Sequence, residues 1–263
     1  MNANNEKGFT LIEILIAMAI ASVVMTGAYR VYTQQVAVNN TQTIVRDMQQ
    51  NIRSAMYYME TEIRMAGLDP SGNARAGVEL AMNGQITVSA DVGGAGSTPG
   101  DPNAFFNGAV DADERVTYRL DTDANDDGIC DNLPANTIPC NLERVSGGVT
   151  SVVAQNVDAL DFVYLGVDTT DATCDNDCLI NGDAGLPGSP VPNDRLDDIR
   201  SIQITIVARA GGAELPGFIV PFDDNREFDG QQAGDIVLSS FLTNDGYRRS
   251  RLSSEISLRN MGL

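Results

Sequence analysis

The stretch Gly8-Phe9-Thr10-Leu11-Ile12-Glu13-Ile14-Leu15-Ile16-Ala17 opens an apolar run that ends near Ala28. Within this run, Glu13 is the only charged residue. About 20 apolar residues at a rise of 1.5 Å match a hydrocarbon core of roughly 30 Å, so the run predicts a membrane-spanning helix. A carboxylate inside such a helix costs roughly 2.5 to 3.5 kcal/mol on insertion scales, which marks Glu13 as a functional residue that needs a partner.

Two simpler interpretations of this segment stay open. A secretory signal would use Lys7 as its positive end and the small residues at 19–21 as its cleavage site. Against it, Glu6 cancels the charge of Lys7, and Glu13 opposes the insertion that a signal must drive. A plain single-span anchor would explain the length and the hydrophobicity but would leave Glu13 without a reason.

The residues Gly8-Phe9-Thr10-Leu11-Ile12-Glu13 resemble the prepilin cleavage site of type IV pilins and type II secretion pseudopilins. In that family a membrane peptidase cuts after the glycine and methylates the new amino terminus. The resemblance therefore implies cleavage between Gly8 and Phe9, and it assigns Glu13 to assembly through the amine of a neighbouring subunit. A buried charge is tolerated chiefly when it is paired, and this amine would supply the pairing.

A second helical pattern follows the apolar run. Seven apolar residues recur at steps of three and four, namely Val45, Met48, Ile52, Met56, Met59, Ile63 and Ala66. This spacing predicts an amphipathic helix that packs one face on a sheet. Gly67, followed by Asp69-Pro70, predicts where the helix ends.

After Pro70 the sequence changes to short β-type runs separated by turns. The runs span residues 85–90, 115–120, 141–145, 157–165, 199–208 and 255–259. In the fifth of them Ile202, Ile204 and Ile206 fall on one face, which the helix could cover. We expect an α+β, type IV pilin-like fold, in which a long N-terminal helix packs on an antiparallel β-sheet domain with disulfide-pinned loops.

These patterns predict four parts along the chain. Residues 1–8 form a leader peptide, and residues 9–30 form the transmembrane or filament-core helix. Residues 31–67 form the amphipathic helix, and residues 68–263 form the globular sheet domain.

Composition excludes several classes of function. The 263 residues carry a net charge of -19, which argues against nucleic acid as a partner because a phosphate backbone needs a basic patch. There is no histidine, so Ser-His and Cys-His nucleophile pairs and His-containing zinc sites are excluded. Paired carboxylates of the glycosidase type stay open, but the acids lie mostly in loops. We therefore expect that the protein is not an enzyme.

The four cysteines are Cys130, Cys140, Cys174 and Cys178. They allow three disulfide connectivities, between which sequence alone does not choose. An oxidising compartment favours disulfides, most simply Cys130 with Cys140 and Cys174 with Cys178. A zinc site with four thiolate ligands is the alternative, although the spacings are irregular.

An acidic stretch around the first cysteine resembles a calcium loop with alternating oxygen ligands and a glycine turn at Gly128. The candidate ligands are Asp123, Asn125, Asp127, the Ile129 carbonyl and Asp131. The twelfth position is Pro134, which cannot supply the bidentate carboxylate of an EF-hand. Calcium is therefore a possible cofactor, with a metal-free acidic turn as the alternative.

Three further passages resemble PilW-type minor pilins: residues 53–67, residues 157–164 and the ending at 247–260. The resemblance implies a minor pilin that primes or caps a type IV pilus. Its partners would be other minor and major pilins, the prepilin peptidase, the inner membrane and the pilus assembly platform. The subunit would cross the inner membrane once, with its globular domain facing the periplasm, and would then enter the extracellular pilus.

Three other functions stay open. A type II secretion minor pseudopilin, of the J-like kind, shares the same leader. A calcium-dependent tip adhesin would use the acidic loop. An anchored hydrolase is the enzymatic alternative, which the absence of histidine disfavours.

Overall fold

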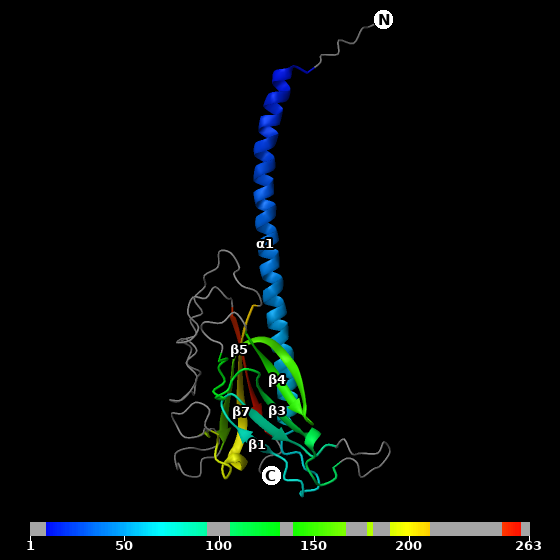
Figure 1. Cartoon of the computed structure of the whole chain (residues 1–263), viewed down its shortest axis with the longest axis vertical. Helices are drawn as coiled ribbons and strands as arrows, with labels where there is room; N and C mark the ends of the chain where they lie inside the picture. Colours follow the sequence, from blue (N-terminus) through cyan, green and yellow to red (C-terminus); the bar gives the residue numbers. More distant parts are fainter. Residues whose placement is uncertain are drawn as a thin grey trace. The chain divides into compact units, whose positions relative to one another are not determined.

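The computed structural model describes residues 9–93, 106–131, 139–166, 178–180, 190–210 and 249–258. The chain divides into two compact units between Val45 and Arg46. Helix α1 (Leu11–Arg64, 54 residues) contributes its first part to one unit and its last part to the other. Figure 1 shows α1 in blue and the strands in the colours that follow it along the sequence.

In the first unit the apolar side chains of α1 are exposed. Phe9 is 84% exposed, and similar exposure continues along the helix, for example 66% at Ile12, 73% at Val23 and 67% at Tyr32. Near its N-terminus the helix is long and apolar enough to cross a membrane. An apolar surface of this extent is rare on a protein that works alone in water, and it indicates contact with lipid or with other protein.

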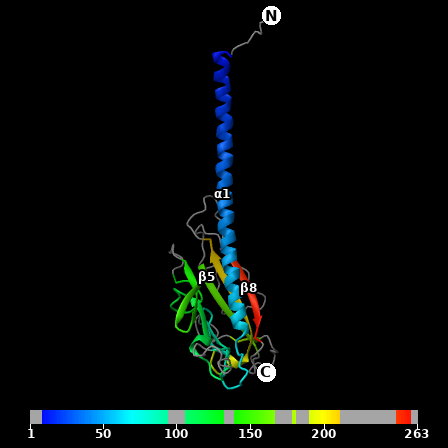
Figure 2. The same cartoon turned by 90° about the vertical axis from the view of Figure 1, so that its right-hand side faces the viewer.

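In the second unit the last part of α1 packs on the sheet, as Figure 2 illustrates. The side chains that it buries are Met48, Ile52, Ala55, Met56, Met59 and Ile63. They repeat at three- and four-residue steps, as predicted, because only one side of a 3.6-residue helix can face the sheet. Burying a methionine or isoleucine side chain stabilises a fold by roughly 1.5 to 3 kcal/mol. This face of the helix is therefore part of the core of the unit, together with buried residues of the sheet.

Polar contacts fix the same helix segment to four strands. Glu62 forms a salt bridge with Arg144 at 2.9 Å and accepts a hydrogen bond from the Tyr118 hydroxyl. Burial and the neighbouring Glu62 carboxylate raise the pKa of Tyr118 above its usual range, so the hydroxyl stays protonated and remains a donor. Glu60 accepts a hydrogen bond from Ser254, and Asn51 donates to the Gln155 carbonyl at 2.9 Å.

The described strands form one antiparallel sheet of eight strands in the order β1-β2-β3-β4-β5-β7-β8, with β6 paired to β5. The first five strands are consecutive neighbours, as is usual for strands that follow one another in the chain. The strands are β1 (Val78–Ala81), β2 (Ile86–Ser89), β3 (Arg115–Leu120), β4 (Cys140–Ser146), β5 (Val149–Gly166), β6 (Cys178–Leu179), β7 (Ile199–Arg209) and β8 (Arg249–Ser257). Two short 3-10 helices, Ala112–Glu114 and Leu196–Asp198, precede β3 and β7.

The predicted α+β arrangement is present, with some differences in the strands. Gly67 ends the helical region with a φ of 76°, a left-handed conformation that suits glycine. The sequence did not predict β1, which has four residues and an irregular register with β2. It also missed the first half of β5, which is mostly exposed and therefore lacks apolar alternation. β8 begins six residues before the predicted run. The sequence did not predict this start because its residues are mostly polar.

A buried ion cluster joins the middle of β5 to the end of β7 and the start of β8. Arg209 on β7 lies directly opposite Arg249 on β8, and like charges in such a pair are destabilising. Asp158, at an irregularity in the β5–β7 register, neutralises them: its carboxylate lies 3.2 Å from Arg209 and 2.7 Å from Arg249. The Asp158 side chain is fully buried. The cluster therefore links β5, β7 and β8 through the Asp158 carboxylate.

We predict that Asp158→Ala lowers the free energy of unfolding by about 3 to 5 kcal/mol, because it leaves two buried guanidinium groups without this carboxylate. The measurement is chemical denaturation of the detergent-solubilised protein. Arg119→Gln is the control, because its 3.9 Å contact with Glu143 is partly exposed and should contribute under about 1 kcal/mol. Equal unfolding midpoints for the two variants would contradict the prediction.

Candidate functional site

The N-terminus of α1 is closed by a reciprocal pair of hydrogen bonds. The Glu13 amide donates to the Thr10 hydroxyl at 3.3 Å, and the Thr10 amide donates to the Glu13 carboxylate at 3.2 Å. This is a capping box, in which two amides without helical partners are satisfied by two side chains. Sequence analysis assigned Glu13 to assembly only, although the signature Thr10-x-x-Glu13 was present.

Glu13 also lies at an apolar groove on the first part of α1. The groove has a volume of about 520 Å³ and is lined by Phe9, Glu13, Ile14, Ala17, Met18 and Ala21. Glu13 is the only ionisable side chain among them. The structure thus brings Phe9 and Glu13 to one surface, whereas Gly8 lies outside the described residues. An apolar surface with one carboxylate suits a partner that is apolar and carries one positive charge.

The acidic stretch at 121–131 forms a loop that is held by its own aspartates. Asp123 accepts hydrogen bonds from the amides of Asp127 at 3.2 Å and Gly128 at 2.8 Å. Asp131 accepts one from the Ala124 amide at 2.7 Å. These bonds satisfy backbone donors in the way of Asx turns, so the side chains of the loop help to fix its own backbone.

The same loop is fixed to the sheet by close backbone contacts. Gly84 donates its amide to the Asp126 carbonyl at 3.1 Å, and Gly128 accepts a hydrogen bond from Leu160 on β5 at 2.8 Å. A Cβ atom at Gly84 would lie 2.3 Å from the Gly128 amide nitrogen, so only glycine fits there. Cys130 and Cys140 form a disulfide with a Cα–Cα distance of 5.8 Å, which is the pairing expected for these two residues.

Calcium binding by the candidate ligands of the acidic loop stays a prediction. In the described part of the chain, no three Asp, Glu, Cys or His side chains gather in a way that could hold a metal ion. Asp127 instead accepts from the Ile129 amide at 2.8 Å, and Asn125 donates to Asp127 at 2.8 Å. The other cysteines give no further information, because Cys174 and the side chain of Cys178 lie outside what the structure describes.

The environment of Asp123 favours its protonated form. Burial raises the pKa of this carboxyl to about 6, and the charges of Asp127 and Asp126 add to the effect. The hydrogen bonds from the Gly128 and Asp127 amides act in the opposite direction. At neutral pH the group is ionised at a cost to stability, as expected where several carboxylates share a half-buried loop.

Comparison with known proteins places one motif on this chain. A family model described as the prokaryotic N-terminal methylation motif matches residues 3–29. No curated protein matches the sequence. Among solved structures, a type IV-like pilin from Thermus thermophilus is similar with 13% identity and a TM-score of 0.41, covering 81% of this chain and 98% of its own. The chain therefore carries the methylation motif at the start of its apolar helix.

We predict that Asp123 makes stability fall as pH rises from about 4 to about 6. Its pKa is higher in the folded protein than the usual value near 3.9, so the contribution is complete below pH 4 and lost above pH 6. After allowance for solvent screening the loss is about 1 kcal/mol. The measurement is the denaturation midpoint at several pH values. Between pH 4 and pH 6 the midpoint should fall less in Asp123→Asn than in the parent. Identical pH profiles would contradict the assignment.

We also predict that Cys130→Ala/Cys140→Ala lowers the free energy of unfolding by about 2 to 3 kcal/mol, because the bond closes a short loop in the unfolded chain. Thermal or chemical denaturation under oxidising conditions measures the effect. An unchanged midpoint would mean that the hydrogen bonds within the loop suffice without the disulfide.

Proposed function

We propose that the protein is a minor pilin, a membrane-anchored subunit that joins a type IV pilus and helps to prime or cap its assembly. The observation that carries this proposal is Glu13, the single charged residue in the exposed apolar run from Phe9 to Ala28. It lies in a segment that matches the prokaryotic N-terminal methylation motif. Neither a soluble enzyme nor a plain anchor needs a carboxylate at this place.

The proposed mechanism begins with cleavage between Gly8 and Phe9. Cleavage creates a positively charged amine at Phe9, next to the apolar groove that contains Glu13. In lipid, an ion pair between this amine and the Glu13 carboxylate of a neighbouring subunit lowers the cost of both charges. The apolar contacts of the groove contribute packing, while the ion pair selects one axial position for the incoming subunit.

The capping box gives Glu13 a second task within its own chain. At the membrane surface and below it, amides at a helix start find few water molecules, so each amide without a partner is costly. The exchange of hydrogen bonds between Thr10 and Glu13 satisfies two of these amides before any other subunit arrives. A useful variant must therefore separate the capping role from the charge.

Under this proposal the chain crosses the inner membrane once. The second unit, with its sheet and acidic loop, faces the periplasm and later the outside of the cell. Its partners are other minor and major pilins, the prepilin peptidase and the assembly platform. The polar, strongly acidic composition of the chain after the apolar segment suits an exported domain that must stay soluble.

We expect the mature protein to begin at Phe9 and to carry one N-terminal methyl group when it is produced with a prepilin peptidase. Intact-mass and N-terminal peptide mass spectrometry measure this directly. Protein produced without the peptidase is the control and should keep residues 1–8. A mature terminus at Ser22 would contradict the proposal and would indicate an ordinary signal peptide.

We expect Glu13→Gln to reduce incorporation into pili at least about tenfold, because it removes the charge but keeps an oxygen acceptor for the Thr10 amide. Membrane insertion should persist, since the helix becomes less polar. Thr10→Ala is the matched control, because it removes the hydroxyl of the cap and keeps the charge, and it should be incorporated nearly normally. Immunoblots of sheared pili and membranes report both quantities. If Thr10→Ala reduced incorporation more than Glu13→Gln, Glu13 would act in capping alone. In a deletion strain, loss of secretion with intact pili would indicate a pseudopilin.

A further inference from the structure

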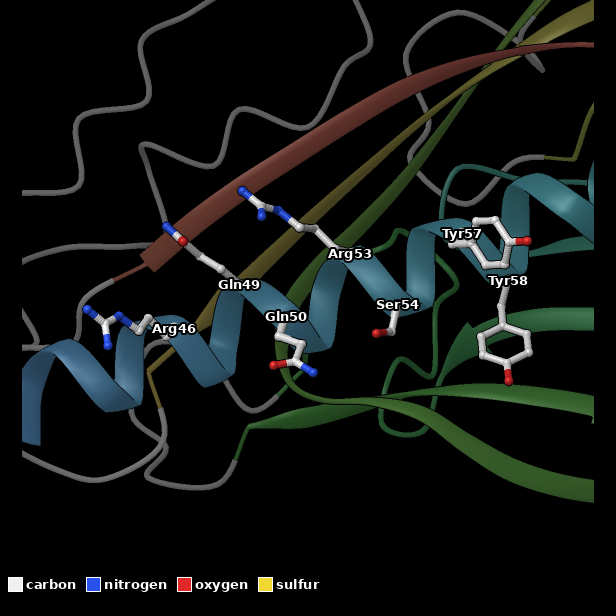
Figure 3. A pocket seen from close by; sticks show the side chains of 7 residues that line it. All are labelled: Arg46, Gln49, Gln50, Arg53, Ser54, Tyr57 and Tyr58. Carbon is white, nitrogen blue, oxygen red and sulfur yellow. The ribbon is translucent and has the colours of Figure 1, made fainter.

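The face of α1 that points away from the sheet carries a groove in the second unit. The groove has a volume of about 610 Å³, and Figure 3 shows its seven lining residues on successive turns of the helix. These residues are Arg46, Gln49, Gln50, Arg53, Ser54, Tyr57 and Tyr58. The set contains two arginines, two tyrosines and no acid, although the whole chain has 36 acidic and 17 basic residues.

The aromatic side chains of this groove are exposed. Tyr57 is 69% and Tyr58 59% exposed, and their rings meet edge to face with centroids 6.5 Å apart. Tyrosine and arginine are the residue types that contribute most to protein interfaces, because each combines a large contact area with polar groups. Two adjacent exposed tyrosines on a rigid helix lose little conformational freedom when a partner covers them.

The arginines of the groove differ from those that are paired on the sheet. Arg115, Arg144 and Arg249 each pair with a carboxylate at 2.7 to 2.9 Å. Within the described residues, Arg46 and Arg53 form no hydrogen bond or ion pair. The groove thus presents two guanidinium groups that are available to external carboxylates.

The acidic loop at 121–131 has the complementary chemistry. It contains Asp121, Asp123, Asp126, Asp127 and Asp131 and no basic residue. It is also rigid, because the Cys130–Cys140 disulfide and the hydrogen bond from Gly84 to Asp126 hold its conformation. No hydrogen bond within the described residues occupies the Asp126 carboxylate, which is therefore available for contact.

We propose that the Arg46–Tyr58 groove on α1 binds the acidic loop at 121–131 of a second copy of this chain. The two surfaces differ, so the contact is head to tail and leaves one groove and one loop free for further copies. The proposal extends the pilus-subunit function proposed above by naming a partner. It concerns the second unit, and therefore depends neither on cleavage at Gly8 nor on the charge of Glu13.

The experiment uses the full-length protein in detergent and measures self-association by sedimentation velocity at low and high salt. The parent should associate with rising concentration, and high salt should weaken the association. Arg46→Gln/Arg53→Gln and, separately, Asp126→Lys should each weaken association about tenfold or more. The control, Arg75→Gln/Arg119→Gln, removes the same charge outside the groove and should behave like the parent. Thermal unfolding of each variant verifies that it is folded.

Mixing the two kinds of variant tests the head-to-tail geometry. The Asp126→Lys variant keeps an intact groove, and the Arg46→Gln/Arg53→Gln variant keeps an intact acidic loop. In the mixture this groove should bind this loop and form a one-to-one complex. The complex should not grow, because its remaining groove and loop are both mutated. A monomeric parent at low salt, equal association of parent and groove variant, or a mixture that forms no complex would each overturn the proposal. A failure of Phe9 processing would instead count against the pilus-subunit function, because this association does not require it.

Discussion

An apolar helix with a single carboxylate must have something other than water around it, and this constraint governs the first unit. The exposed side chains from Phe9 to Tyr32 have no covering surface among the described residues. Lipid can cover them, but lipid cannot satisfy Glu13. Its intrachain contacts with Thr10 satisfy two amides but leave the negative charge in place. A cation from a neighbouring molecule would neutralise it, and this is the contact on which the proposed role in assembly depends.

Sequence patterns predicted those parts of the fold that follow from local periodicity. The methionine and isoleucine stripe, the glycine at the helix end and the longer apolar strands all have one face that must be buried, and this requirement appears in the spacing of residues. Glu13 stood out for a related reason, because a charge interrupts an otherwise apolar run. Strand segments without regular alternation of apolar and polar residues, such as the start of β5 and of β8, give no such signal.

The parts that sequence did not predict depend on contacts between distant segments. Asp158 neutralises Arg209 and Arg249 only because the register of β5 shifts beside it and β8 brings Arg249 opposite Arg209. The acidic loop is similar, because the spacing of its aspartates does not indicate which of them accept hydrogen bonds from backbone amides. The groove at Arg46 and Arg53 has no distinct sequence signal, because polar residues are expected on the exposed side of any amphipathic helix.

The polar contacts at the end of α1 have a mechanical consequence. Glu62 contacts β3 and β4, Asn51 contacts β5, and Glu60 contacts β8, alongside the buried methionine face. A pull along this helix segment would be distributed over contacts with all four strands, so each contact would carry only part of the force. Such parallel loading resists rupture far better than sequential peeling, a property that would matter to any subunit held in a fibre under tension.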